Sequence, residues 1–103
     1  MPKYLFVYHG GEPPKSADEA KTVMAKWNSW LDGLGEAAVD RGNPAGPSKT
    51  VYADKVADTG GANPASGYSL IEAADMDNAI AKSKGCPIFE AGGTIEIAEA
   101  VKI

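Results

Sequence analysis

The stretch YLFVYHGG, residues 4–11, carries the strongest structural signal in this chain, because its first five residues are apolar or aromatic on both alternating faces. Aromatic and β-branched residues followed by two glycines predict a β-strand over residues 4–8. Successive side chains of a strand point to opposite sides, so Tyr4, Phe6 and Tyr8 share one face. Because the other face is also apolar, we expect this strand to be covered on both sides.

Two helices and three further strand-like segments follow. Ser16 and Glu19 form an S-x-x-E capping box that begins an amphipathic helix ending near Gly35. Asp75 caps a second, shorter helix. The remaining predicted segments are an interrupted strand, or a strand with a protruding loop, over 36–53; a turn-rich exposed segment over 55–67; a strand over 68–74; and a strand over 94–103.

The resulting order, β-α-β-β-α-β, predicts a ferredoxin-like α+β fold. Its sheet has four antiparallel strands, and right-handed crossovers place both helices on one face. A chain of 103 residues is close to the commonest domain size, so we expect one domain over residues 1–103.

The face of the sheet opposite the helices is the central prediction. We expect Leu5 and Val7 to face the helices, so that the three aromatic rings of residues 4–8 lie on the other side. On the last strand Ile95 and Ile97 suit the helix side, which leaves the acidic residue between them on the uncovered side. Exposed rings would form an apolar patch of several hundred Å². We therefore expect a second copy of the chain to cover this face in a two-fold homodimer.

Composition excludes several classes of partner. The net charge is -4 and the ten basic residues are scattered, so we expect no nucleic-acid partner, including one stacked on the aromatic rings. The single cysteine, Cys86, excludes an internal disulfide and fits a cytoplasmic protein. No apolar run approaches the roughly 20 residues of a membrane span. With one histidine and no phosphate-loop pattern, we predict no metal site and no cofactor.

Several motifs, in their order and spacing, resemble the YCII-related family, also called DGPF-domain proteins. They are YLFVYHGG at 4–11, VMAKWNSWLDGLG at 23–35, GNP at 42–44, SKTV at 48–51, GYSLIEAADMDNAIAKSKGCP at 67–87 and GGTIEIAE at 92–99. The resemblance implies a dimeric α/β barrel, in which two ferredoxin-like sheets face each other around a shared cavity. It also implies a relationship to proteins that bind or transform small organic molecules.

The chain departs from this family at two functional motifs. In the YCII branch a histidine on the first helix pairs with an aspartate as the proposed catalytic dyad, but residues 16–35 contain no histidine. The Asp-Gly-Pro-Phe tetrapeptide of the other branch is also missing, because Asp58 is followed by Thr59. No activity therefore transfers from the resemblance.

His9 and Glu96 are the candidate catalytic residues. His9 ends the first strand and could act as a general base at the cavity mouth, or it could be a strand-end histidine bonded to backbone. Glu96 is predicted to face the cavity, with Glu72 as a possible neighbour. A carboxylate between two sheets is costly unless it is paired, which favours a base or a ligand anchor. The alternative is a solvated rim residue or a weak ion pair.

Tyr4, Tyr8, Asn43 and Glu72 are the candidate ligand-binding residues, with the two tyrosines orienting the ligand. We expect the protein to bind a small organic molecule between the sheets of two subunits, and any catalysis to be cofactor-free acid–base chemistry. The alternative is a non-catalytic dimeric interaction or regulatory module. Cys86 is expected to be a small buried residue and not a nucleophile.

Overall fold

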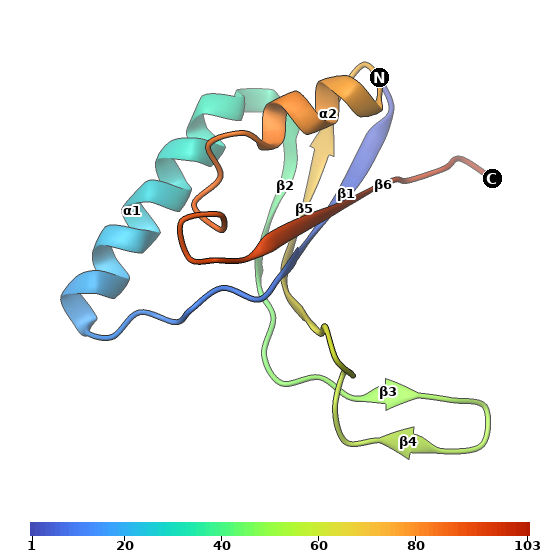
Figure 1. The fold of residues 1–103 in the computed structure, drawn as a ribbon. Helices are drawn as coiled ribbons and strands as arrows, with labels where there is room; N and C mark the ends of the chain where they lie inside the picture. The colour runs from blue at the N-terminus through green and yellow to red at the C-terminus, as the bar shows by residue number, and fades with distance from the viewer.

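A computed structural model describes all of residues 1–103 as one four-stranded antiparallel sheet with two helices and a separate two-stranded hairpin (Figure 1). The elements are β1 (Lys3–His9), α1 (Ala17–Leu34), the 3-10 turn η1 (Gly35–Ala37), β2 (Ala38–Pro44), β3 (Thr50–Val51), β4 (Val56–Ala57), β5 (Ala65–Glu72), α2 (Met76–Ser83) and β6 (Thr94–Glu99). The strand order β2-β5-β1-β6 confirms the predicted ferredoxin-like α+β fold. No helix has both the length and the apolar character that crossing a membrane requires.

Both helices begin at the predicted caps. The Ser16 hydroxyl accepts a hydrogen bond from the Glu19 backbone N–H at 3.1 Å, and the Asp75 carboxylate accepts one from the Asn78 N–H at 2.8 Å. Such side chains satisfy backbone donors that the first helical turn leaves unpaired. Gly35, at φ +57°, ends α1 in a conformation that disfavours residues with a Cβ.

The prediction for the orientation of β1 is wrong. Tyr4, Phe6 and Tyr8 lie in the core beneath the helices, and Phe6 is 0% exposed. The reason is pairing register: Phe6 lies opposite Ile97 and Tyr8 lies opposite Ile95 on β6. Directly opposed residues of neighbouring strands share a face, so the rings follow the isoleucines to the helix side. Period-two alternation could not reveal this, because both faces of β1 are apolar.

The sheet face away from the helices, here called the open face, carries a different set of side chains. It consists of Leu5, Val7 and His9 on β1, Tyr68 and Leu70 on β5, and Glu96 and Ala98 on β6. Leu5 and Tyr68 remain 39% and 40% exposed. The protein therefore does have an apolar uncovered face, but it is built from aliphatic side chains and Tyr68 instead of the β1 rings.

The segment between α1 and β5 also differs from expectation. The GNP motif lies inside β2, where Gly42 adopts φ +77° at a register shift against β5. A Cβ at Gly42 would overlap the Tyr68 carbonyl oxygen, so this bulge requires glycine. The predicted strand near Val51 does not join the sheet. It pairs only with β4 and forms a hairpin that projects from the body.

Candidate functional site

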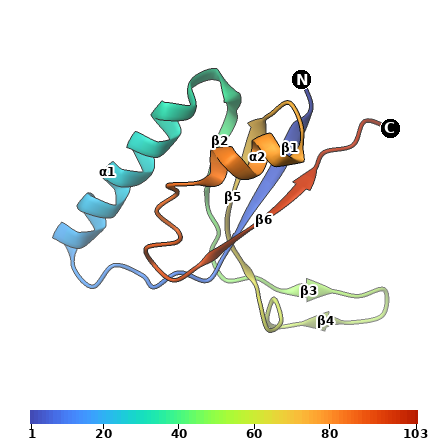
Figure 2. The same ribbon diagram turned by 45° about the horizontal axis from the view of Figure 1, so that its top comes forward.

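Helix α1 packs closely against the sheet only through its C-terminal half. Leu31 is buried and Trp27 is half-buried, and the Trp27 ring meets the Tyr8 ring edge-on with centroids 4.9 Å apart. Towards the N-terminus Met24 is 55% exposed although it belongs to the apolar stripe of the helix. Both ribbon views show the first turns of α1 standing away from the strands (Figures 1 and 2).

This divergence leaves a cleft of about 830 Å³ between α1, the β1 end and the loop after α2. We call it the α1 cleft. Its apolar and aromatic lining includes Tyr8, Val23, Met24, Trp27, Leu31 and Ile88. Its polar lining includes Glu12, Glu19, Arg41, Asn43, Ser66 and Ser69. A concave volume in the range of several hundred Å³, mostly apolar with a few polar groups, is typical of small-molecule sites.

Three polar groups meet at the floor of the α1 cleft. The Tyr8 hydroxyl donates to Ser69 Oγ at 2.8 Å, and Ser69 Oγ donates to the Arg41 carbonyl at 2.7 Å. Burial raises the pKa of the Tyr8 phenol, so it remains a protonated donor at neutral pH. Nearby, Ser66 Oγ is buried and has no hydrogen-bond partner. An unpaired buried hydroxyl is costly, and it is the one buried side-chain polar atom without a partner.

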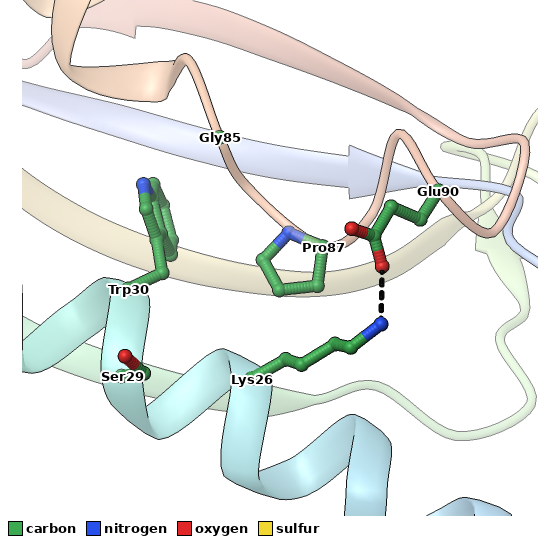
Figure 3. A pocket seen from close by; sticks show the side chains of 6 residues that line it. All are labelled: Lys26, Ser29, Trp30, Gly85, Pro87 and Glu90. Atoms are coloured by element: carbon green, nitrogen blue, oxygen red, sulfur yellow. Dashed lines mark hydrogen bonds and ion pairs between the residues drawn. The ribbon is translucent and has the colours of Figure 1, made fainter.

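Ion pairs hold α1 to its neighbours at the cleft margins. Lys26 Nζ lies 3.0 Å from Glu90 Oε2 on the loop after α2, as Figure 3 shows. Beside this pair a smaller notch of about 300 Å³ is bordered by Trp30 and Pro87 (Figure 3). The Trp30 indole N–H donates to the Lys82 carbonyl at 3.3 Å. These contacts position α1 without closing the cleft.

His9 and Glu96, the predicted catalytic pair, are in contact on the open face and outside the α1 cleft. His9 Nε2 lies 2.9 Å from Glu96 Oε1, and Nδ1 lies 3.0 Å from the Asn63 carbonyl oxygen and 3.2 Å from that of Pro64. These neighbours can only accept hydrogen bonds, so the imidazolium form satisfies both ring nitrogens. The hydrogen bond to Glu96 is the main reason that the His9 pKa is raised.

The other predicted site residues separate into two groups. Tyr4 is buried in the core and contacts neither surface of interest, which corrects its assignment to a cavity between sheets. Tyr8 is also beneath the helices, but it lines the α1 cleft. Asn43 also borders the cleft, at the edge strand β2, but its side-chain amide donates at 3.4 Å to the hydroxyl of its register partner Tyr68, which belongs to the open face.

Glu72 does not adjoin Glu96. Val7 lies between Glu96 on one side and Tyr68 on the other, so Tyr68 is the residue across from Glu96. Glu72 lies four residues further along β5, roughly 13 Å away along the strand. The predicted pair of carboxylates is therefore not formed.

Sequence patterns missed the residues that shape the α1 cleft. Trp27 belongs to a regular apolar stripe, which indicates a core position and carries no sign that the helix diverges. Nothing in the sequence distinguishes Ser66 from other loop and strand serines. Of the predicted ligand-binding residues, Tyr8 and Asn43 line the cleft, and Tyr8 was expected on the other face.

Metal and thiol chemistry have no support at either surface. No three histidine, cysteine, aspartate or glutamate side chains gather closely enough to hold a metal ion. Cys86 is buried in the core, and burial raises the pKa of its thiol to about 11. A thiol with this pKa is almost entirely protonated at neutral pH, and the protonated form is a poor nucleophile.

Among known proteins, no family model matches the chain, and no curated protein shows significant similarity to it. What the structure establishes is an α+β fold with a four-stranded antiparallel sheet and two helices.

Proposed function

We propose that this protein binds a small organic molecule in the α1 cleft. The observation that carries the proposal is the concave volume of about 830 Å³ that is lined by the Tyr8 and Trp27 rings and by polar residues such as Arg41. Aromatic rings provide apolar contact area, and one or a few polar groups orient a ligand. The expected ligand is mostly apolar and carries a small number of polar groups.

Acid–base catalysis is a weaker part of this proposal. The Tyr8 phenol already donates its proton to Ser69 Oγ, so it can only accept a hydrogen bond from a ligand, and it is a poor base at neutral pH. His9 and Glu96 could move a proton only for a molecule bound on the open face, because they lie on the other side of the sheet. Binding without catalysis is thus the simpler function for the α1 cleft.

A substitution that fills the α1 cleft tests this proposal. Ala20 is exposed on α1 and lines the cleft, so Ala20→Phe should occupy ligand space without disturbing the core. We expect the dissociation constant of the apolar fluorophore 8-anilinonaphthalene-1-sulfonate, read by quenching of Trp27 and Trp30, to rise at least about tenfold. A thermal-shift screen of small metabolites on the unmodified protein would then identify natural ligand classes.

Ala25→Phe is the matched control, because Ala25 is exposed on α1 but does not line the cleft. It should leave the affinity for the fluorophore unchanged. Equal affinities for both variants would place the binding elsewhere and overturn the assignment to the α1 cleft.

A second candidate function, homodimerisation through the open face, has its own support. The chain exposes 6935 Å², whereas a compact monomer of 10.7 kDa exposes about 5,500 Å². Its radius of gyration is 14.8 Å, against about 13 Å for a compact domain of this length. The excess of roughly 1,400 Å² exceeds the ~800 Å² that each partner buries in a standard interface. A second copy that covers the open face, where Leu5 and Tyr68 are exposed, would bury part of this excess.

Leu5→Glu tests this homodimer by placing a charge at the centre of the open face. Sedimentation velocity over a dilution series should show a dimer for the unmodified chain. The dissociation constant of the dimer should be at least about tenfold higher for the Leu5→Glu variant. Ile103→Glu is the control, because Ile103 is exposed beyond the end of β6. If the unmodified chain is monomeric at all concentrations, the homodimer proposal is overturned.

Membership of the YCII-related family belongs to the same proposal. Its support is the ordered set of motifs quoted above together with the ferredoxin-like fold, and the open face is consistent with the dimeric barrel that the resemblance implies. A location in the cytoplasm likewise remains a prediction from cysteine usage.

A further inference from the structure

The connection between β2 and β5, which contains the β3–β4 hairpin, is unusually long. Twenty residues, 45–64, connect two neighbouring strands of the sheet, whereas most connections in compact domains have about 4–6 residues. We call this segment the arm. It extends clear of the helices and of the sheet in both ribbon views (Figures 1 and 2). Long ordered connections of this kind are usually functional.

One face of the arm is apolar and uncovered. Val51 and Val56 are directly paired, so their side chains share a face of the ribbon. These two valines and Tyr52 are each at least half exposed. The Lys55 ammonium lies 4.9 Å from the Tyr52 ring centroid, which is the ring's only aromatic or cationic neighbour. A two-stranded hairpin without further packing is marginally stable in water, so this arm requires a partner surface.

The base of the arm is attached to the body at the open face. Nδ1 of the His9 ring lies within hydrogen-bonding distance of the carbonyl oxygens of Asn63 and Pro64, and the Ala45 N–H donates to the Ser66 carbonyl. His9 itself belongs to the open face through its contact with Glu96. The base of the arm therefore lies at the edge of the open face, and the β3–β4 hairpin projects outward from there (Figure 1).

We propose that the arm docks on a second copy of this chain and forms part of the homodimer interface. This inference rests on the proposed homodimer. The chain exposes about 1,400 Å² more than a compact monomer of its mass, and the exposed residues of the arm contribute to this excess. This excess is larger than the ~800 Å² that each partner buries in a standard interface. In a dimer with a two-fold axis each arm would pack against the other subunit, so the assembly would be complete with two copies.

Shortening the arm tests this proposal. Because Thr50 and Ala57 are directly paired, an Asn-Gly turn can replace residues 51–56 and join them without disturbing the register. We expect the dissociation constant of the dimer, measured by sedimentation velocity, to rise at least about tenfold. The double variant Val51→Thr and Val56→Thr, which keeps strand-forming residues, should also raise this dissociation constant. Far-ultraviolet circular dichroism checks that both variants are folded.

The control lies on the same arm. Lys49→Gln with Asp58→Asn removes an exposed ion pair of 3.1 Å but keeps the apolar face, so the dimer should persist. If the folded variants dimerise like the unmodified chain while Leu5→Glu dissociates it, the homodimer stands and the role of the arm is wrong. If the unmodified chain is a monomer, both proposals are overturned.

Discussion

The two faces of the sheet differ in burial although the strand that they share, β1, is apolar on both. On the helix side Phe6 is fully buried among aromatic and aliphatic neighbours. On the open face Leu5, the adjacent residue, keeps more than a third of its surface exposed. The difference shows that an apolar sequence pattern identifies a strand with two faces to cover, but does not identify what covers each face.

The helix side also holds both a packed and an unpacked region. Trp27 and Leu31 close the core beneath the C-terminal half of α1, while Met24 borders the α1 cleft. The same regular stripe of apolar residues therefore serves the core at one end of the helix and a cavity at the other. The candidate site is identified by the exposed N-terminal part of this stripe, and not by the amino-acid composition of the stripe.

The largest expected difference is between Phe6→Ala and Leu5→Ala. Phe6→Ala should lower the free energy of unfolding by about 3–5 kcal/mol, because it creates a cavity in a fully buried layer. Leu5→Ala should cost less than about 1.5 kcal/mol in the monomer, because much of its side chain is already in water. Urea denaturation at a fixed, low protein concentration measures both. Equal costs in the monomer would contradict the contrast between the two faces.

A smaller effect is expected for the hydrogen bonds beneath the α1 cleft. Tyr8→Phe removes the donor to Ser69 Oγ and should lower the free energy of unfolding by about 1 kcal/mol. Ser69→Ala should cost about 1–3 kcal/mol, since it also removes the bond to the Arg41 carbonyl. The double variant should cost less than the sum of the two. Strict additivity would show that these hydroxyls do not interact in solution.

The smallest effect is expected for the ion pair on the open face. Glu96→Gln should lower stability by less than about 1 kcal/mol, because the Glu96 side chain is 67% exposed. The His9 pKa is raised in the folded state, so the difference should be fully present below about pH 6.5 and vanish as the pH rises through the raised pKa.

Thermal unfolding of both chains across this pH range measures that difference. The chain has one histidine, so nuclear magnetic resonance follows its titration without ambiguity. A difference in stability that does not change with pH would separate His9 from Glu96 in solution.

Local signals predicted much of the fold because they act within a few residues. The Ser16 and Asp75 caps were found correctly, since a capping hydrogen bond joins residues three apart. The element order followed from these boundaries. The interior of the segment 36–67 was harder, because the Gly42 bulge and the separate hairpin depend on how β2 pairs with β5.

The candidate site was less accessible to prediction. His9 and Glu96 were selected separately, and their contact depends on the register between β1 and β6. The α1 cleft depends on the angle at which α1 leaves the sheet, which no periodicity encodes. Tyr8 was selected for a cavity on the wrong face and lines the α1 cleft because its register partner Ile95 faces the helices.

By itself, then, the sequence determined the two helices, the four strands of the main sheet to within a few residues, and their ferredoxin-like order, because hydrophobic period and end caps are properties of neighbouring residues. Only the tertiary structure decided which face of β1 enters the core, where α1 diverges and where the arm projects. These features depend on register and packing between segments far apart in the chain, and a single residue of register exchanges the two faces of a strand.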